Sequence, residues 1–524
     1  MPRKPQPPTD YDALIRLFDD FRAYQEPPAA NGVHDYSVDA MSAQIRRLPE
    51  FHARLEAIDT TGWTISHKVD CALVRAEMNG LEFDHNVLRP WERDPSFYSI
   101  IEAGESDVPA REAPCKHGTL QLFACSFPLN DGQIHEFRAK IAAIPAILAH
   151  AKQTLTVSTK ELYLLGIRQK EHELRVLRNL ARRLADMHPN LVGLMEQAGA
   201  SVENFLAWLQ QRHAAMPDSH DGIGIEEFDW SMKHVHLVPY CWREQKEIIR
   251  RELERSWTAL KMEEHRNRHL PRLRPPASVE EMQARVDAAY PEFMGFLREQ
   301  EIFTVPDYMA LGGGKVRGLA PPQDRDFFTQ VDYHNMLPLR CHMVHWLEKQ
   351  REERNTHPIR SRPLLYNIWD SRAEGFATAF EETMLQAGMM DKTPRARELV
   401  YILVAFRAAR AMGDLKMHSR EWRLKEAIDY SVAGTPRGWL KADGDTIIGD
   451  LGLYLRQPGY GTSYVVGKIQ FERLIADRAM QIGDGFNLKE FLDGYFALGM
   501  IPASLIRWEM TGLDDEIVSL ASDS

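Results

Sequence analysis

The chain has 524 residues, of which 44% are hydrophobic and 27% are charged, and its formal net charge is -11 at pH 7. This length and apolar content allow a large buried core, arranged either as one helical body or as roughly three domain-sized units. The acidic balance and the absence of a basic run argue against a nucleic-acid-binding surface.

The sequence predicts neither a secretory nor a membrane segment. No apolar stretch follows residues 1–8, so we expect no secretory signal. No window approaches the roughly 20 apolar residues of a membrane-spanning helix, so we expect no membrane partner. The five cysteines are an odd number without the spacing of a metal site. A reducing, cytoplasmic location is therefore expected.

Helical periodicity dominates the chain. Apolar side chains recur every three or four residues in three clear stripes, and each stripe predicts a helix with one buried face. The stripes lie at residues 11–21, 137–148 and 399–409. Strand-like alternation is brief, and its best case runs from His234 to Val238. The sequence therefore predicts a mainly α protein with only minor β-structure.

Glycine, proline and asparagine mark the expected breaks between helices. The clearest breaks lie at residues 84–90, 271–276, 311–314 and 433–436. We expect a linker near 270–280 to separate an N-terminal helical half, residues 1–275, from a C-terminal half, residues 276–524. The C-terminal half carries the functional motifs, and one integrated body is the expected arrangement.

Some short motifs resemble ligand sites but have simpler explanations. The run from Gly312 to Lys315 lacks the spacing of a phosphate-binding loop, so a turn is expected. His234 and His236 share one face of the strand-like segment without a third ligand nearby, so structural roles are expected. A further pair of histidines, at 342 and 345, has helical i,i+3 spacing and could also bind a metal. For this pair we expect a role at the surface or at the core edge.

The segment from Tyr333 to His342 resembles the metal-binding helix of a zinc hydrolase, but the catalytic base and one metal ligand are replaced. Such an enzyme needs a histidine pair for the metal and a neighbouring glutamate as base. Here His334 remains, Asn335 stands where the base belongs, and Arg340 stands near the second ligand. An amide is no useful base at neutral pH, and a guanidinium repels a divalent cation. The sequence therefore predicts no bound zinc and no other cofactor.

Four C-terminal segments between residues 330 and 510 carry a family resemblance. Their matching residues are, in order, His334 and Pro338; Glu374 and Glu381; Arg410, Asp414, His418 and Trp422; and Pro458, Gly459, Ser463, Tyr464 and Gly467. In order and spacing, these segments resemble the bacterial domain-of-unknown-function 885 family. The fold of that family is similar to the large helical fold of the glutamate-zincin peptidases.

The resemblance implies a zinc-peptidase-like helical fold with a central cleft. It also implies that Glu374 stands at a metal-ligand position and that Tyr464 stands where a donor stabilises an oxyanion. The chain departs from the family pattern at Asn335 and Arg340. The resemblance therefore predicts the fold of this chain more directly than its activity, because a fold does not fix a function.

The retained polar residues suggest specific pairings. Arg410 and Asp414 stand at i,i+4 and are expected to pair on one helix. Asp414 can in turn orient His418, one turn further on. Arg340 is expected within salt-bridge reach of Glu374, where its guanidinium would replace the charge of the missing metal. The predicted substrate-binding residues are Arg340, Glu374, Arg410, Asp414 and Tyr454, and the predicted catalytic residues are His334, His418 and Tyr464.

Such groups suit proton abstraction and donation. We therefore expect a metal-independent lyase that cleaves a small molecule by elimination or retro-aldol chemistry. Trp346 and Trp369 lie close to the motifs and would suit an aromatic substrate. Two alternatives stay open: a zinc-dependent hydrolase that uses His334, Glu374 and His342, and a binding protein without catalysis. The expected partner is the small-molecule substrate, and a homodimer is compatible with the sequence.

Overall fold

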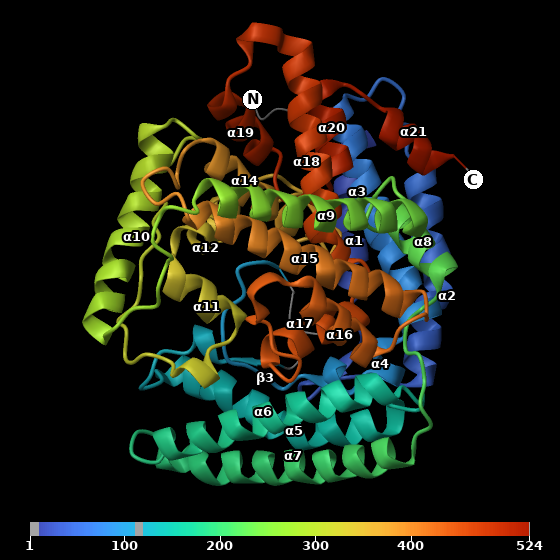
Figure 1. Cartoon of the computed structure of the whole chain (residues 1–524). Helices are drawn as coiled ribbons and strands as arrows, with labels where there is room; N and C mark the ends of the chain where they lie inside the picture. The colour runs from blue at the N-terminus through green and yellow to red at the C-terminus, as the bar shows by residue number, and fades with distance from the viewer. Residues whose placement is uncertain (1–9, 110–118, 523–524) are drawn as a thin grey trace, which may run out of the picture. The chain divides into compact units, whose positions relative to one another are not determined.

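The computed structural model describes residues 10–109 and 119–522. Helices account for most of these residues, and the β-structure within them is limited to two sheets of two short strands each. The predicted mainly α fold with minor β-structure is therefore confirmed (Figure 1). Within the described ranges, no helix is both long and apolar enough to cross a lipid bilayer.

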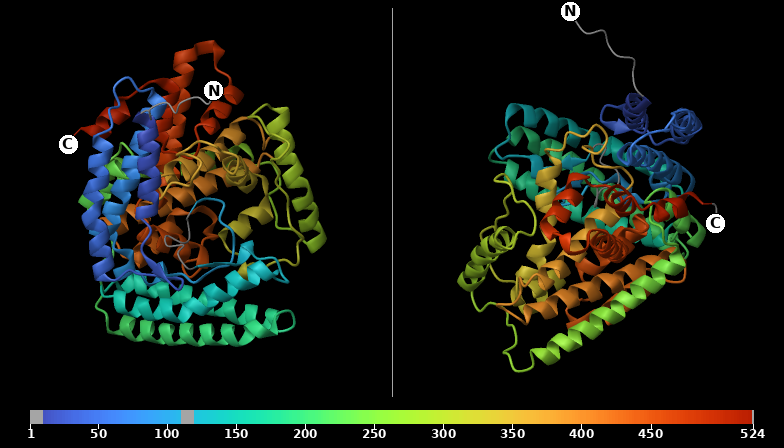
Figure 2. Two further views of the ribbon diagram at one scale, coloured as in Figure 1. Left: turned by 180° about the vertical axis from the view of Figure 1, so that it is seen from behind. Right: turned by 90° about the horizontal axis from the view of Figure 1, so that it is seen from above.

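The chain divides into two compact units. Unit 1 comprises Met1–Thr61 and Glu77–Ile223, and unit 2 comprises Gly62–Ala76 and Gly224–Ser524. The expected division at residues 275/276 falls inside unit 2. The helix before that point, α9 (Trp242–Arg266), packs along α15 (Ala396–His418), so both helices belong to the same unit (Figure 2).

Unit 1 is built from helices and the two small sheets. Its helices are α1 (Asp10–Tyr24), α2 (Val38–Glu56), the second part of α3 (Ile65–Phe83), α4 (Pro90–Arg93), α5 (Asp131–Thr154), α6 (Lys160–Leu184) and α7 (Pro189–Ala215). Its strands are β1 (Ala29–Ala30), antiparallel to β2 (Val33–His34), and β3 (Ile101–Glu102), parallel to β4 (Leu120–Gln121). Helix α7 packs against both α5 and α6 (Figure 1). The predicted stripe at 137–148 is the buried face of α5, where Ile141 and Ile144 are inaccessible to solvent.

At the core of unit 2 lie two helices that are buried along nearly their whole length, α14 (Asp370–Gln386) and α15. The sequence of α15 is apolar on most of its circumference, which is typical of a helix inside a large core. Helix α14 packs against α18 (Tyr460–Ile482), and α15 packs against α9 and α16 (Leu424–Gly434). The other helices of unit 2 are the first part of α3, α8 (Ile225–His234), α10 (Val279–Glu299), α11 (Phe327–His334), α12 (Leu337–His342), α13 (Val344–Glu352), α17 (Asp445–Arg456), α19 (Leu488–Ala497), α20 (Ala503–Thr511) and α21 (Asp515–Ala521).

Predicted breaks coincide with helix ends. The π-turn η1 (Asp84–Leu88) occupies the break at 84–90 and ends at Arg89, whose φ is +39°. The break at 271–276 separates α9 from α10, and the break at 433–436 follows α16. The strand expected from His234 to Val238 is wrong. Helix α8 ends at His234, and Leu237 has a left-handed φ of +54°, which an extended strand excludes.

Helices α14 and α18 touch backbone to backbone at two glycines. A Cβ added to Gly375 would lie 2.4 Å from the Cα of Gly467, and a Cβ added to Gly467 would lie 2.0 Å from the carbonyl oxygen of Ser371. Neither position has room for a methyl group. This close approach sets the distance between Glu374 on α14 and Tyr460 on α18.

Gly375→Ala should therefore destabilise the protein. Alanine normally stabilises a helix interior relative to glycine by about 0.5–1 kcal/mol, whereas overpacking against backbone costs about 1–3 kcal/mol. The matched control is Gly449→Ala in α17, where an added Cβ meets nothing within 4 Å. Urea unfolding should show lower stability for the first variant and unchanged or higher stability for the second. Equal effects in both variants would contradict the tight contact.

Candidate metal centre

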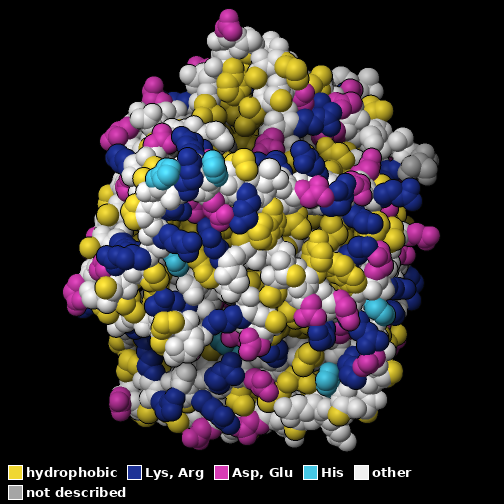
Figure 3. Space-filling model, viewed as in Figure 1, with side chains coloured by type: hydrophobic (Ala, Val, Ile, Leu, Met, Phe, Trp, Pro, Cys, Tyr) yellow, Lys and Arg dark blue, Asp and Glu magenta, His cyan; other side chains and the backbone are white. Residues whose placement is uncertain are grey.

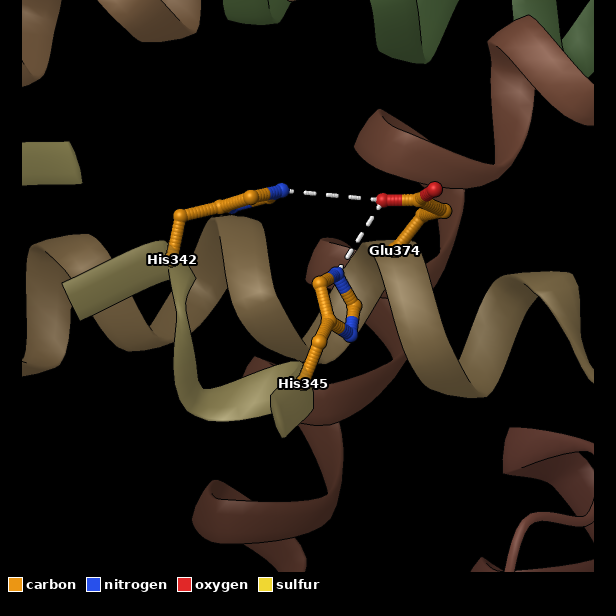
Figure 4. A group of neighbouring side chains, drawn as sticks. All are labelled: His342, His345 and Glu374. Atoms are coloured by element: carbon orange, nitrogen blue, oxygen red, sulfur yellow. Dashed lines mark ion pairs between the residues drawn. The ribbon is translucent and has the colours of Figure 1, made fainter. Parts of the chain in front are cut away.

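Three side chains from three helices converge in unit 2 (Figure 4). His342 ends α12, His345 lies in the first turn of α13, and Glu374 lies in the second turn of α14. Glu374 Oε2 lies 3.3 Å from His345 Nε2 and 3.7 Å from His342 Nε2. One ligand atom from each residue lies within 4.8 Å of the other two. Together they offer two nitrogens and one oxygen to a single point.

The interruption of the helix between α12 and α13 produces this arrangement. Met343 separates the two short helices, so the two histidines flank a bend. Their rings lie nearly perpendicular, at 88°, with centroids 4.9 Å apart. The side chains of His345 and Glu374 are 1% exposed, and that of His342 is 18% exposed. The site is therefore nearly closed around two of its ligands and partly exposed at His342.

Further contacts orient two of the three candidate metal ligands, Glu374 and His342. The hydroxyl of Tyr460 donates to Glu374 Oε1 over 2.5 Å, so the other oxygen faces the histidines. His342 Nδ1 lies 3.0 Å from Oε1 of the buried Glu381, which leaves Nε2 directed at Glu374. A carboxylate behind a histidine is the usual support of a metal-binding imidazole, because it holds the ring and its tautomer.

Glu381 is itself held in its ionised form. The guanidinium of Arg407 binds it bidentately, with distances of 2.8 Å and 2.6 Å. Burial opposes ionisation, but Arg407 and His342 outweigh it and hold the pKa of Glu381 below its usual value. Arg407 Nη2 also lies 3.1 Å from His342 Nδ1. Because an ionised carboxylate can only accept, and Arg407 Nη2 already donates to Glu381, we assign the Nδ1 proton to the contact between His342 and Glu381.

These donors fit a divalent metal ion such as zinc. Zinc favours imidazole nitrogens and carboxylate oxygens, and catalytic zinc sites use three protein ligands. Glu374 brings a carboxylate into a site that is almost closed to water, where a cation would offset the cost of its burial. His342, His345 and Glu374 would hold the ion, with Tyr460 and Glu381 supporting two of the ligands.

The expected ion pair between Arg340 and Glu374 is wrong. Arg340 Nη2 lies 3.0 Å from both carboxylate oxygens of Asp332, and its Nη1 donates to the Tyr290 hydroxyl over 3.0 Å. The cause is the break before α12, which turns Arg340 toward α11 and α10. Burial raises the pKa of Asp332 to about 6, against the opposing effect of Arg340.

His334, a predicted catalytic residue, lies outside the converging group. It ends α11, where its Nδ1 donates to the Gln330 carbonyl over 2.6 Å. Its ring stacks on Trp439 at a centroid distance of 4.6 Å, beside a cavity of about 560 Å³. Asn335 accepts a hydrogen bond from the backbone N–H of Leu337, at the start of α12.

The expected pair between Arg410 and Asp414 is also wrong, because Arg410 pairs with Asp450 on α17. Asp414 instead accepts hydrogen bonds from the backbone N–H groups of Thr462 (3.1 Å) and Gly459 (3.5 Å). Burial raises the pKa of Asp414 to about 8, in opposition to these bonds.

The expected contact between Asp414 and His418 is present. His418 Nε2 lies 3.5 Å from Asp414 Oδ1 and donates to the Tyr454 carbonyl over 3.0 Å. His418 and Asp414 are both inaccessible to solvent. Tyr464 is buried beside Arg410, whose guanidinium lies 5.3 Å from the ring centre. The predicted catalytic residues thus occupy dissimilar surroundings: His334 beside a cavity, His418 and Tyr464 in the core.

The histidines at 342 and 345 were expected at the surface or the core edge, whereas His345 is buried and both lie near Glu374. The contacts of Tyr460 and Arg407, and the support that Glu381 gives His342, were not predicted. One available signal was the i,i+7 spacing of Glu374 and Glu381, which places both carboxylates on one face of a helix. The partners on α12, α13, α15 and α18 come from separate segments, and no local spacing brings them together.

Residues 345–510 match the model of a family described as "Bacterial protein of unknown function (DUF885)". The family resemblance is confirmed for these residues, which hold the second, third and fourth of the resembling segments but not the first, with His334 and Pro338. The comparison with curated proteins found no match. The matched segment includes His345, Glu374 and the residues that support Glu374 and His342.

Two solved structures share the fold. One is "the structure of a putative lipoprotein of unknown function from Shewanella oneidensis", with a TM-score of 0.70 and 15% identity over 96% of this chain and 100% of that chain. The other is "the crystal structure of the putative lipoprotein from Colwellia psychrerythraea", with a TM-score of 0.67 and 13% identity over 96% of this chain and 99% of that chain. At this identity the likeness concerns the fold alone.

Metal-stripped full-length protein should take up close to one equivalent of zinc. His345→Ala and Glu374→Gln should each weaken zinc binding by more than roughly 100-fold, the upper range for losing only a supporting residue. His265→Ala, an exposed histidine on α9, is the matched control and should bind zinc like the unaltered chain. Isothermal titration calorimetry measures all four proteins. Absence of saturable uptake, or uptake unchanged in His345→Ala, would contradict the site.

Tyr460→Phe should weaken zinc binding by roughly 10–100-fold, the usual cost of losing a residue that orients a ligand. The variant removes one hydroxyl and changes no charge, but it takes one hydrogen-bond donor from the buried Glu374. Tyr495→Phe alters another fully buried tyrosine of unit 2 and serves as the control. Thermal melting of the metal-free forms separates binding from folding. If both variants bind zinc equally well, the hydroxyl of Tyr460 does not orient Glu374.

Proposed function

We propose that this protein is a zinc-dependent hydrolase with a remodelled ligand set. The observation that carries the proposal is the convergence of His342, His345 and Glu374 within 4.8 Å, two of them oriented by further hydrogen bonds or ion pairs. This is the alternative with remodelled ligands, but with His345 in place of His334. A bound zinc would act as a Lewis acid toward a carbonyl or phosphoryl oxygen.

The protein groups around the site have separable tasks in this proposal. Tyr460 holds Glu374 so that one oxygen remains directed at the histidines, and Glu381 keeps the Nδ1 proton of His342 in place. The buried ion pair of Glu381 with Arg407 keeps that carboxylate charged. Substrate would approach from the side of His342, the most exposed of the three ligands.

The metal-independent lyase stays a competing prediction. It requires His334, His418 and Tyr464 to act on one ligand. Solvent-inaccessible His418, with its Nε2 bound to a main-chain carbonyl, is poorly suited to exchange protons with a substrate. The buried metal donors therefore support the hydrolase better.

The printed descriptions of the two structural neighbours call them putative lipoproteins. A lipoprotein is anchored at a membrane surface, so this description does not support the cytoplasmic location expected from the cysteines. Location outside the cytoplasm is the alternative that these neighbours suggest, and fractionation of cells that produce the full chain tests it.

The zinc-loaded chain should hydrolyse at least one member of a panel of aminoacyl and acyl anilides, esters and phosphoesters. Chelation should abolish the activity, and zinc should restore it. His345→Ala and Glu374→Gln should lower the rate by at least about 10²–10⁴-fold, the range typical of lost catalytic groups, while His265→Ala keeps it.

Two outcomes would overturn the hydrolase. One is turnover that persists in chelator and depends on His334 and Tyr464, which supports the lyase. The other is stoichiometric zinc binding without turnover of any substrate in the panel, which supports a binding protein.

A further inference from the structure

We propose that a second site in unit 2, the basic cavity beside His334, binds a small dianionic ligand. The cavity has a volume of about 560 Å³. It is lined by the end of α9 and the residues after it, the last residue of α11, the start of α15 and the turn after α16. Nothing in the proposed hydrolase chemistry uses it.

The charge of the lining favours an anion. Four arginines (Arg268, Arg272, Arg395, Arg437) and two glutamates (Glu264, Glu398) line the cavity, so the balance is +4 − 2 = +2. His334 adds no charge at neutral pH, because burial and nearby arginines lower its pKa. On the face shown in Figure 3, basic and acidic side chains are interleaved.

Two of the arginines are held in place by the protein. Arg395 donates to the carbonyls of Asn267 and Leu270 and pairs with Glu398 at 2.7 Å, which fixes the segment after α9. Arg437 Nη2 pairs with Glu264 and with Glu398, at 2.9 Å and 3.0 Å, and its other nitrogens remain available to a ligand. A guanidinium already fixed in position loses little entropy on binding.

The other two arginines supply donors without strong internal partners. Arg268 donates from Nη1 to the His265 carbonyl. Within the described ranges the Arg272 guanidinium has no hydrogen-bond or ion-pair partner. Guanidinium groups match the planar, paired oxygens of phosphate and carboxylate groups. The ligand class is therefore a phosphate ester or a dicarboxylate, each of which carries about two negative charges at neutral pH.

The wall formed by Trp439 and His334 suggests how an organic part would be held. The two rings stack at a centroid distance of 4.6 Å with an interplanar angle of 28°. The stacked rings give the cavity an aromatic wall next to the arginines, against which an apolar part of a ligand would pack. An aromatic phosphate should therefore bind more tightly than inorganic phosphate.

The test is calorimetric titration of the full chain with inorganic phosphate, phenyl phosphate and malate at low ionic strength. All measurements use the His345→Ala background with chelator present, so that no ligand binds a metal at the other site. Saturable binding of phosphate or malate is expected, with phenyl phosphate tighter than phosphate. The ratio of phosphate to malate affinity distinguishes the two ligand chemistries.

Arg268→Ala and Arg272→Ala should each weaken binding by roughly tenfold, the effect of one lost charge-assisted hydrogen bond. Arg266→Ala is the matched control, because it removes the same charge from the end of α9 outside the cavity lining. Trp439→Ala should reduce the preference for phenyl phosphate. Absence of binding to all three anions, or equal loss in Arg266→Ala and Arg272→Ala, would overturn the proposal.

Discussion

Charge buried along α14 and α15 is the constraint on which the rest of unit 2 depends. Leaving one buried charge without its partner costs about 3–5 kcal/mol, so each must be matched inside the protein. Arg407 is matched by Glu381 and Arg410 by Asp450, on two different helices. These arginines are three residues apart on α15, so they lie on the same face of that helix about one turn apart, and each meets a different helix packed there. Pairing of buried charge thus couples α15 to both α14 and α17.

The candidate metal centre depends on two features of the backbone. The bend at Met343 places His342 and His345 on either side of the point that Glu374 faces. The glycine contact between α14 and α18 brings the Tyr460 hydroxyl within 2.5 Å of Glu374. The ligands are therefore positioned by the meeting of helices that are far apart in sequence. A spacing rule for a single helix cannot describe such a site.

The sequence predictions were correct where the interactions join residues that are close in sequence, and wrong where the partners come from distant segments. The helices and most of the breaks were predictable, because apolar periodicity and glycine or proline breaks act within a few residues. Asp414 and His418 were predictable as neighbours for the same reason. The partners of Arg340 and Arg410 were predicted wrongly, because a motif position and an i,i+4 spacing were preferred to the acids that the fold supplies, Asp332 and Asp450.

The segment around His334 shows what the substitutions at Asn335 and Arg340 do in the fold. Asn335 bonds to the start of α12, and Arg340 is neutralised by Asp332, so local structure accounts for both substituted residues. Neither of them faces Glu374 in place of a metal. The buried carboxylate of Glu374 lies close to two histidines further along the chain from His334, His342 and His345. In the proposed zinc site, the buried carboxylate would still favour a cation, and the nearby imidazoles of His342 and His345 would complete the ligand set despite the two substitutions.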